Sequence, residues 1–298
     1  MRIGVVGTSW WTQLMHGPGA LASPDWELTT IYGRSLDKAE ALAETFSCTA
    51  TNDLDALLAQ TDALVLAVPP DVQVSLGSLA AKAGKHLLLE KPLALDPDRG
   101  RELLTAIEGS GVANLVFFTA RWLPGAAAWL DATASQGGWE SGRYEHLLRL
   151  PDAMLEASPW RAEHGALWDV GPHAVSALER VLGPVTQVSA VRGVRDHVHL
   201  TMRHGELSSS AELSLSAPEG VRRTSYSFLG AAGEAVPDEK ATDVSQPASA
   251  CVAALAELAD QVRTGRRGGV DAAYGMHVLE VLTAAQKSLS SGRVELVS

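Results

Sequence analysis

The sequence predicts an α/β protein with two domains, the first a doubly wound parallel sheet and the second an α+β domain with an open, largely antiparallel sheet. The chain has 298 residues, about twice the roughly 150 of a typical domain. In residues 1–118, short apolar runs alternate with helical patterns, which is typical of βαβ units. Beyond them, apolar and polar residues alternate with a period of two, as in antiparallel strands with one face in water.

Apolar runs without polar alternation predict parallel strands that are buried on both faces. These runs cover residues 3–6, 28–32, 64–68, 87–89 and 115–118. Apolar residues at spacings of three and four predict the helices between them, over residues 37–46, 54–58, 72–83 and 98–107. This order is that of a Rossmann domain, so we expect a nucleotide-binding domain over residues 1–118 and a second domain over residues 119–298.

The second domain is expected to combine helices with strands that have one wet face. Period-two alternation predicts strands over residues 198–202 and 207–215, and further strands are expected over residues 144–150, 186–191 and 224–229. Helical spacing predicts helices over residues 125–134, 170–182, 249–262 and 272–289. Residues 230–247 are rich in Ala, Gly, Pro and Asp and predict a loop.

Composition narrows the classes of partner. The 24 Lys and Arg against 35 Asp and Glu give a formal charge of −11, which repels nucleic acids and anionic membrane surfaces. The two cysteines, Cys48 and Cys251, form neither a disulfide framework nor a zinc motif. No apolar run has the length of a membrane span, and the first strand begins without a signal-peptide pattern. We therefore expect a cytoplasmic protein with no nucleic-acid or membrane partner.

Gly7 follows the first strand, where a dinucleotide fold carries G-x-G-x-x-G. The first glycine of that motif makes a tight turn, the second lets the backbone approach a pyrophosphate, and the third admits close helix packing. Ser9 and Thr12 stand at the second and third positions. We expect a loosened phosphate loop over Gly7, Thr8 and Ser9, with Trp10 and Trp11 either beside a bound cofactor or over a domain interface.

The end of the second strand predicts the choice of cofactor. An NAD enzyme places Asp or Glu here for the ribose 2′-hydroxyl, whereas an NADP enzyme places Arg and small hydroxyl residues for the 2′-phosphate. This chain has Arg34 and Ser35, followed by Lys38. One charge-assisted contact is worth roughly 1.5–3 kcal/mol, so Arg34 predicts a preference of about 10- to 150-fold for NADP(H). The alternative is a solvated arginine that opens a helix.

Two blocks of residues carry a resemblance to a known family. An apolar strand ends in Val68-Pro69-Pro70, and Gly84-Lys85-His86 leads through the next strand to Glu90-Lys91-Pro92. Farther on, Trp160-Arg161 precedes Gly165-Ala166-Leu167-Trp168-Asp169-Val170-Gly171-Pro172-His173. Arg121 with Pro124 and Phe228-Leu229-Gly230 with Gly233 supply the remaining motifs. The chain resembles, over essentially its whole length, the Gfo/Idh/MocA family, named for glucose-fructose oxidoreductase, inositol dehydrogenase and a rhizopine catabolism protein.

The resemblance implies an NAD(P)-dependent oxidoreductase that acts on a CH–OH group of a sugar, polyol, inositol or related cyclic hydroxy or keto compound. It implies that Lys91 contacts the nicotinamide ribose and the substrate hydroxyl, that His173 is the acid/base, and that Asp169 orients the substrate or the proton relay. The other residues it places at the site are Val68, Pro69, Gln73 and Glu90 for the cofactor, and Arg121, Trp160 and Arg161 for the substrate. It also implies a homodimer or homotetramer that associates through the wet face of the second sheet.

The residue types suit hydride chemistry, which needs a group that moves a proton and a group that stabilises charge on oxygen. Asp169 and His173 are four apart, so on one helix they would share a face. If that helix begins at Asp169, its positive end favours a neutral imidazole at His173. The alternative is that Asp169 is only an N-cap and His173 only a satisfied histidine in a domain interface.

Two other interpretations of the function stay open. A tightly held NAD could serve a non-redox elimination or glycoside cleavage, or the chain could be a catalytically silent dinucleotide-binding module. Gln73 stands where this family often has histidine, which leaves the surroundings of the nicotinamide unpredictable. His197 and His199 have the spacing of some metal pairs, but no third ligand is evident in the sequence. We therefore expect a solvated strand face there and no metal.

Overall fold

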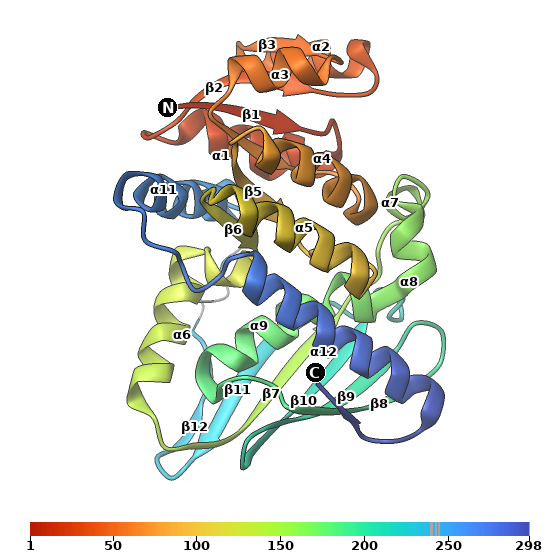
Figure 1. Ribbon diagram of the computed structural model, residues 1–298. Coiled ribbons are helices and arrows are strands. Elements are labelled where there is room, and N and C mark those ends of the chain that lie inside the picture. Colours follow the sequence, from red (N-terminus) through yellow and green to blue (C-terminus); the bar gives the residue numbers. More distant parts are fainter. Residues whose placement is uncertain (239–240, 242, 244, 298) are drawn as a thin grey trace. The chain divides into compact units, whose positions relative to one another are not determined.

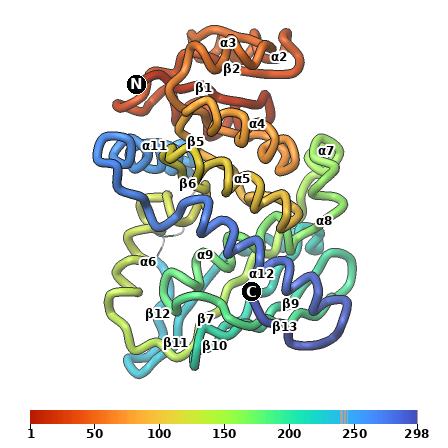
Figure 2. The backbone as a smooth tube through the Cα atoms, in the orientation of Figure 1, coloured from red at the N-terminus to blue at the C-terminus, as the bar shows by residue number. Residues whose placement is uncertain are grey.

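The computed structural model describes residues 1–238, 241, 243 and 245–297, and these residues form two compact units. The first unit contains Met1–Leu123 and Val244–Met276, and the second contains Pro124–Asp243 and His277–Ser298. The colours of Figure 1 and the backbone tube of Figure 2 show this path, with the chain passing twice through each unit. A single division at Thr119 therefore differs from the observed partition, because a late segment of the chain folds with the first unit.

The first unit is a fully parallel six-stranded sheet in the order β3-β2-β1-β4-β5-β6. Its strands are β1 (Arg2–Val6), β2 (Glu27–Tyr32), β3 (Thr49–Thr51), β4 (Ala63–Leu66), β5 (His86–Glu90) and β6 (Asn114–Phe117). Its helices are η1 (Thr12–His16), α1 (Gly17–Ala22), α2 (Leu36–Phe46), α3 (Leu54–Gln60), α4 (Pro70–Lys82), α5 (Pro97–Ser110), η2 (Thr119–Arg121) and α11 (Ala248–Thr264). The strand order reverses between β1 and β4, which is the point where such sheets bind ligands beyond their carboxyl ends.

Local sequence signals fix the helices around this sheet. Asp53 caps α3 by accepting hydrogen bonds from the backbone of Asp55 and Ala56. Asp96 caps α5 in the same way, with Pro97 in the first turn where no backbone donor is needed. The helices α4 and α5 pack against each other (Figure 1). The strand β3 was not expected from the sequence, because it has three residues and pairs only with β2 at the edge of the sheet.

Helix α11 belongs to the first unit because its apolar face is buried there. Cys251, Ala254 and Leu255 are fully buried, and the helix contacts η1, α1, β5 and β6. The indole Nε1 of Trp26 donates to the carbonyl of Leu255 at 2.8 Å. These contacts draw Val244–Met276 away from the rest of the region beyond Thr119.

The second unit is a mixed sheet in the order β12-β11-β7-β10-β9-β8-β13. Its strands are β7 (Trp139–Leu147), β8 (Gln187–Arg192), β9 (Val198–His204), β10 (Leu207–Ser214), β11 (Arg223–Gly230), β12 (Gly233–Ala235) and β13 (Glu295–Leu296). Neighbouring strands run antiparallel except β7 and β10, which are parallel. The helices are α6 (Pro124–Gln136), α7 (Asp152–Glu156), α8 (Pro159–Asp169), α9 (Gly171–Leu182) and α12 (Ala272–Ser291), the last of which begins in the first unit.

One face of this sheet is covered and the other is open, as the period-two alternation predicts. Val198, Leu200 and Met202 are buried, whereas His199 and Thr201 between them are exposed. Helix α9 packs on β7 and β10.

Two expected bounds in this unit differ from the structure. The strand expected over residues 144–150 starts earlier, at Trp139. The loop expected over residues 230–247 contains the short β12, and its residues 239, 240, 242 and 244 lie outside the described residues. Among the described helices, none is long and apolar enough to cross a membrane.

Candidate functional site

The turn after β1 requires glycine at position 7. Gly7 has a φ of 120°, and its backbone N–H donates to the carbonyl of Tyr32 at 2.9 Å. A Cβ atom at this position would lie 2.3 Å from the carbonyl oxygen of Ala67, just beyond β4. The first function expected of the glycine motif, a tight turn at the reversal of strand order, is therefore present.

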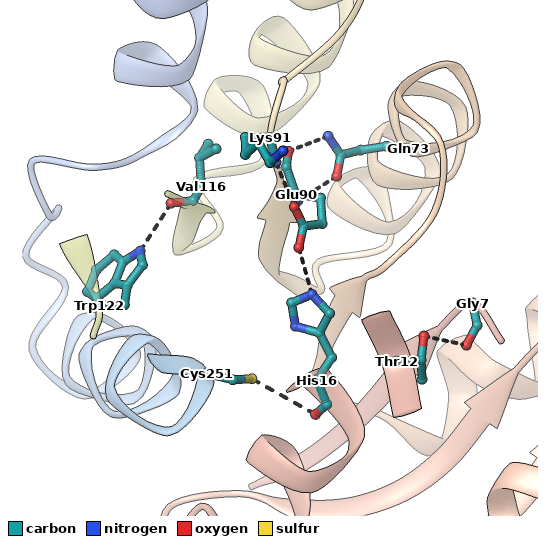
Figure 3. Close-up of polar contacts among 9 residues, drawn as sticks. All are labelled: Gly7, Thr12, His16, Gln73, Glu90, Lys91, Val116, Trp122 and Cys251. Atoms are coloured by element: carbon teal, nitrogen blue, oxygen red, sulfur yellow. Dashed lines mark hydrogen bonds and ion pairs between the residues drawn. The ribbon is translucent and has the colours of Figure 1, made fainter. Parts of the chain in front are cut away.

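Thr12 compensates for the missing third glycine of the motif. Its side chain is buried, and Oγ1 donates to the carbonyl of Gly7 at 3.0 Å (Figure 3). The close packing that glycine would allow occurs instead at Gly17, where a Cβ atom would lie 2.3 Å from the ring of Phe46. The intervening π-helical turn η1 accommodates this shift, and such turns recur at functional sites.

Trp10 and Trp11 lie at the start of the helix that follows the loop. Their ring centroids are 4.9 Å apart with planes inclined by 30°, and the side chain of Trp10 is 50% exposed. The N–H of Gln13 donates to the carbonyl of Ser9 at 3.2 Å, so the N–H groups between them precede the first turn of hydrogen bonds. Backbone donors in this position attract anions such as a pyrophosphate.

The residues expected to select the cofactor lie beyond β2. Gly33 donates its backbone N–H to Thr51 at 3.1 Å, and Arg34, Ser35 and Lys38 after it are all exposed. Their exposure suits contact with a ligand phosphate and equally suits a solvated arginine. Val68 and Pro69, in the turn between β4 and α4, are half-buried and exposed, respectively.

A buried glutamine holds the turn that contains Lys91. Gln73 is fully buried, and its amide Oε1 accepts from the N–H of Glu90 at 2.7 Å. Its Nε2 donates to the carbonyl of Glu90 at 2.8 Å (Figure 3). The same nitrogen lies within 3.3 Å of the carbonyls of Pro92 and Leu93. The Lys91–Pro92 peptide bond within this turn is cis. Gln73 was expected among the cofactor-binding residues, but its side-chain amide is engaged by the backbone of the turn.

His16, which was not expected from the sequence, joins the candidate site through Glu90. Its side chain is fully buried, and Nε2 lies 2.7 Å from Oε1 of Glu90. The second carboxylate oxygen of Glu90 accepts from the backbone N–H of Lys91 at 3.1 Å. Figure 3 shows this chain of contacts running from His16 to Lys91. The signal that could have found it is Glu90 itself, because a carboxylate at the end of a buried strand requires a partner.

Phe117 and Cys251 pack against His16. The ring of Phe117 meets the imidazole edge-on with centroids 5.1 Å apart. The Cys251 thiol lies 3.9 Å from the carbonyl of His16, and burial raises the pKa of this thiol. Cys251 therefore stays protonated and acts as packing.

The second unit gathers three of the residues expected to bind substrate or orient it. Arg161 Nε lies 3.2 Å from the Asp169 carboxylate, and the guanidinium lies 4.5 Å above the ring of Trp160. Arg161 Nη1 also donates to Ser158 Oγ at 2.6 Å. Gly165, with a φ of 66°, kinks α8 and lets the chain bring Arg161 and Asp169 together. Asp169 is buried, so its ion pair is shielded from water.

Asp169 and His173 do not share one helix, contrary to the sequence expectation. Asp169 is the last residue of α8, and α9 begins at Gly171. Pro172 causes the break, because its ring would clash with the carbonyl four residues earlier in a continuous helix. His173 nevertheless lies in the first turn of α9, whose N-cap residue Val170 provides no side-chain hydrogen bond. Asp169 is therefore not the N-cap of this helix.

Arg121, a further residue expected to bind substrate, lies near the end of the first pass through the first unit. Arg121 is the last residue of η2 and is half-buried. The neighbouring Trp122 donates its indole Nε1 to the carbonyl of Val116 at 3.3 Å (Figure 3). The end of this turn is thus fixed to β6.

On the open face of the second sheet, Glu212 lies beside His197 and His199. It is the third potential metal ligand that was not evident in the sequence. Glu212 of β10 lies directly across from His199 of β9, and its Oε1 is 2.9 Å from Nε2 of His197. Strand pairing brings this carboxylate to the two histidines, so their spacing in the sequence could not show it.

The chain is similar to known oxidoreductases. Residues 1–118 match the family described as Gfo/Idh/MocA, oxidoreductase family, NAD-binding Rossmann fold. A dTDP-3,4-didehydro-2,6-dideoxy-α-D-glucose 3-reductase of Streptomyces violaceoruber is 32% identical over 65% of this chain and 60% of its own length. The scyllo-inositol 2-dehydrogenase (NADP(+)) of Bacillus subtilis is 30% identical over 64% of this chain and 61% of its own. The aligned region thus spans about three fifths of each relative.

A solved structure extends the similarity of fold to the whole chain. The WlbA dehydrogenase from Bordetella pertussis, in complex with NADH and UDP-GlcNAcA, superposes with a TM-score of 0.87. The similarity covers 100% of this chain and 98% of that one at 20% sequence identity. Both sheets of the present chain therefore belong to a known architecture.

Proposed function

Because this chain belongs to the Gfo/Idh/MocA oxidoreductase family, we propose that it is an NADP(H)-dependent dehydrogenase or reductase. Its substrate class is a sugar, polyol, inositol or related cyclic hydroxy or keto compound, and hydride moves between the cofactor and a CH–OH carbon. The observation that carries the proposal is the buried, braced Glu90-Lys91-Pro92 turn at the carboxyl end of β5. The names of the relatives, a reductase of a dTDP-sugar and an NADP(+)-linked inositol dehydrogenase, support the substrate class.

The residues of the first unit fit a dinucleotide. Gly7 leaves no room for a Cβ atom, and the first N–H groups of the following helix supply donors for a pyrophosphate held by Gly7, Thr8 and Ser9. Arg34, with Ser35 and Lys38, would hold the 2′-phosphate of NADP(H). Trp10, Trp11, Val68 and Pro69 would flank the cofactor. When bound, the nicotinamide supplies or accepts the hydride.

The catalytic roles follow from residue chemistry and from the family motifs. The Lys91 ammonium would stabilise negative charge on the substrate oxygen, and the His173 imidazole would accept or return the hydroxyl proton. Asp169 would orient the substrate through a carboxylate that Arg161 holds in place. Arg121 and Trp160 would contribute to substrate binding. Gln73, Glu90 and His16 act through Lys91 and are positioning residues.

The test is hydride transfer by the purified chain, followed by nicotinamide absorbance with NADP⁺ and a panel of sugars, polyols and inositols. On the best substrate, His173→Ala and Lys91→Met should each lower kcat by about 10²- to 10⁴-fold. Lys82→Met, which removes an exposed lysine from the end of α4, is the matched control and should leave kcat unchanged. Undiminished turnover by His173→Ala would refute the acid/base role, and turnover with no net change in reduced nicotinamide would favour the elimination chemistry.

A further inference from the structure

The open face of the second sheet carries a compact set of metal-binding side chains that the proposed function does not use. His199 on β9 and Glu212 on β10 occupy directly opposed positions of an antiparallel pair. His197 precedes His199 by two residues, so both imidazoles stand on the same face. The two rings stack with centroids 4.8 Å apart and planes inclined by 18°.

The donor atoms of these three side chains already converge. Each can offer one atom, and the three atoms lie within 4.8 Å of one another. Zinc binds histidine nitrogen and carboxylate oxygen at about 2.0–2.2 Å, which places tetrahedral ligand atoms about 3.4 Å apart. Small rotations of the side chains would bring the three donor atoms from within 4.8 Å of one another to this spacing. The side chains have room to rotate because His197 and Glu212 are half-buried and His199 is exposed.

The surroundings of the cluster favour a cation. Glu145 on β7 lies directly across from Glu212 on the other side of β10, so two carboxylates face each other across adjacent strands. Like charges directly opposed at the strand spacing of about 4.8 Å destabilise a sheet, and Arg223 relieves this repulsion from the Glu145 side only. Arg223 Nη1, at 3.5 Å, and Ser225 Oγ, at 3.0 Å, both contact Glu145, whereas Glu212 contacts His197.

A surface hollow gives access to the cluster. It has a volume of about 300 Å³, and its lining includes Arg143, Glu145, His199, Thr201, Ser210 and Glu212. Two of the three side chains, His199 and Glu212, line the hollow, and His197 lies beside them. Three protein ligands leave a fourth coordination position for water or for another ligand, which is the arrangement of open zinc sites.

We propose that His197, His199 and Glu212 form a binding site for one divalent ion of the zinc type. The site lies wholly within the second unit and is independent of the proposed dinucleotide chemistry. Two imidazoles and one carboxylate favour zinc over magnesium or calcium, which prefer oxygen ligands.

The test is a calorimetric titration of chelator-treated full-length protein with zinc chloride, repeated with magnesium chloride. Wild type should bind one zinc ion per chain in a saturable manner and should not bind magnesium at this site. His199→Ala and Glu212→Gln should each weaken zinc binding at least tenfold. His164→Ala is the matched control, because it removes a half-buried histidine that contacts Trp168 outside the cluster, and it should bind zinc like wild type.

Cobalt provides a second measurement on the same variants. Cobalt-loaded wild type should show the visible absorption of a low-symmetry nitrogen and oxygen site, and the two cluster variants should lose it while their circular dichroism stays that of folded protein. Absence of saturable zinc binding would overturn the proposal. Unchanged zinc binding by a variant lacking all three side chains would also overturn it.

Discussion

Lys91 owes its position to buried polar groups on three different elements. Gln73 on α4 pairs with the backbone on both sides of Lys91, and Glu90 accepts the N–H of Lys91 itself. His16, at the end of η1, contacts the other oxygen of that carboxylate. Because buried polar groups are costly when a partner is lost, each member of this network depends on the others.

His16→Leu should expose that dependence. The substitution leaves one oxygen of the buried Glu90 carboxylate without its partner, so we expect the free energy of unfolding to fall by about 1.5–3 kcal/mol. If Lys91 acts as proposed, kcat should fall while KM changes little, because the turn is displaced without loss of a substrate contact. Urea unfolding and steady-state kinetics measure the two effects.

His16→Gln is the matched rescue. A glutamine can place its amide nitrogen close to the position of the imidazole Nε2, so it should restore most of the stability and of kcat. If leucine and glutamine at position 16 give the same kinetics, His16 is packing and does not position Lys91.

At the scale of elements, the turn between β1 and its helix is the feature least tolerant of a side chain. Gly7→Ala would place a Cβ atom against the carbonyl of Ala67 at a φ of 120°. We expect a loss of about 2–5 kcal/mol of stability, from the positive φ and the overlap together, and weaker binding of dinucleotide.

Gly84→Ala is the control for that prediction. Gly84 also has a positive φ, 74°, but an added Cβ atom would meet nothing within 4 Å. Gly84→Ala should lower the free energy of unfolding by only the 1–2 kcal/mol, roughly, that a positive φ costs a residue with a Cβ atom. It should leave nucleotide binding unchanged. Equal losses for the two variants would mean that the contact with Ala67 is unimportant. Thermal unfolding and nucleotide titration give both quantities.

The pairing of α9 with α12 predicts a dependence of stability on pH. His277 Nε2 lies 2.6 Å from Oε1 of Glu179, and this hydrogen bond raises the pKa of His277 above its usual 6.5. The folded state therefore holds the proton more tightly than the unfolded state. The resulting stabilisation is complete below pH 6.5 and is lost as the pH rises through the pKa of the folded protein.

His277→Gln should therefore destabilise the protein more in acid than in base. The free energy of unfolding of the variant should be lower than that of wild type by about 1.5–3 kcal/mol near about pH 5.5, and by less near about pH 9. Urea unfolding of wild type and variant at both pH values measures it, with His164→Gln as the control. A deficit that is the same at both pH values would contradict the assigned pKa shift.

The sequence predicted elements well where a hydrophobic period exists. The five long strands of the first sheet and the helices α2, α4, α5 and α11 lie almost at the expected bounds. The short β3 and β13 carry too few residues for a period. The break between α8 and α9 was marked by Pro172 but obscured by the helical spacing of Asp169 and His173 on either side of it.

At the scale of the whole molecule, the sequence could identify residues but not their partners. Lys91, Asp169 and His173 were recognisable because they stand in motifs that are continuous in the chain. The partnership of His16 with Glu90 joins positions 74 residues apart, and that of His197 with Glu212 depends on strand pairing. The assignment of α11 to the first unit depends on long-range packing of the same kind.

We expect a homodimer or homotetramer that forms through the open face of the second sheet, because a large solvated sheet face is available there for a symmetric contact. The cluster of His197, His199 and Glu212 would then lie at or beside that contact. Light scattering should give two or four times the chain mass of 31.4 kDa. A mass equal to that of one chain at all concentrations would contradict this expectation.

The proposed preference of this chain for NADP(H) can be measured in one titration of the purified protein. Tryptophan fluorescence would be followed as NADPH or NADH is added to wild type, to Arg34→Ala and to the control Arg101→Ala, which removes an exposed arginine from α5. We predict that wild type binds NADPH about 10- to 150-fold more tightly than NADH, that Arg34→Ala abolishes the difference, and that Arg101→Ala preserves it. Failure of wild type to bind either nucleotide, with none released on denaturation, would rule out the proposed oxidoreductase function.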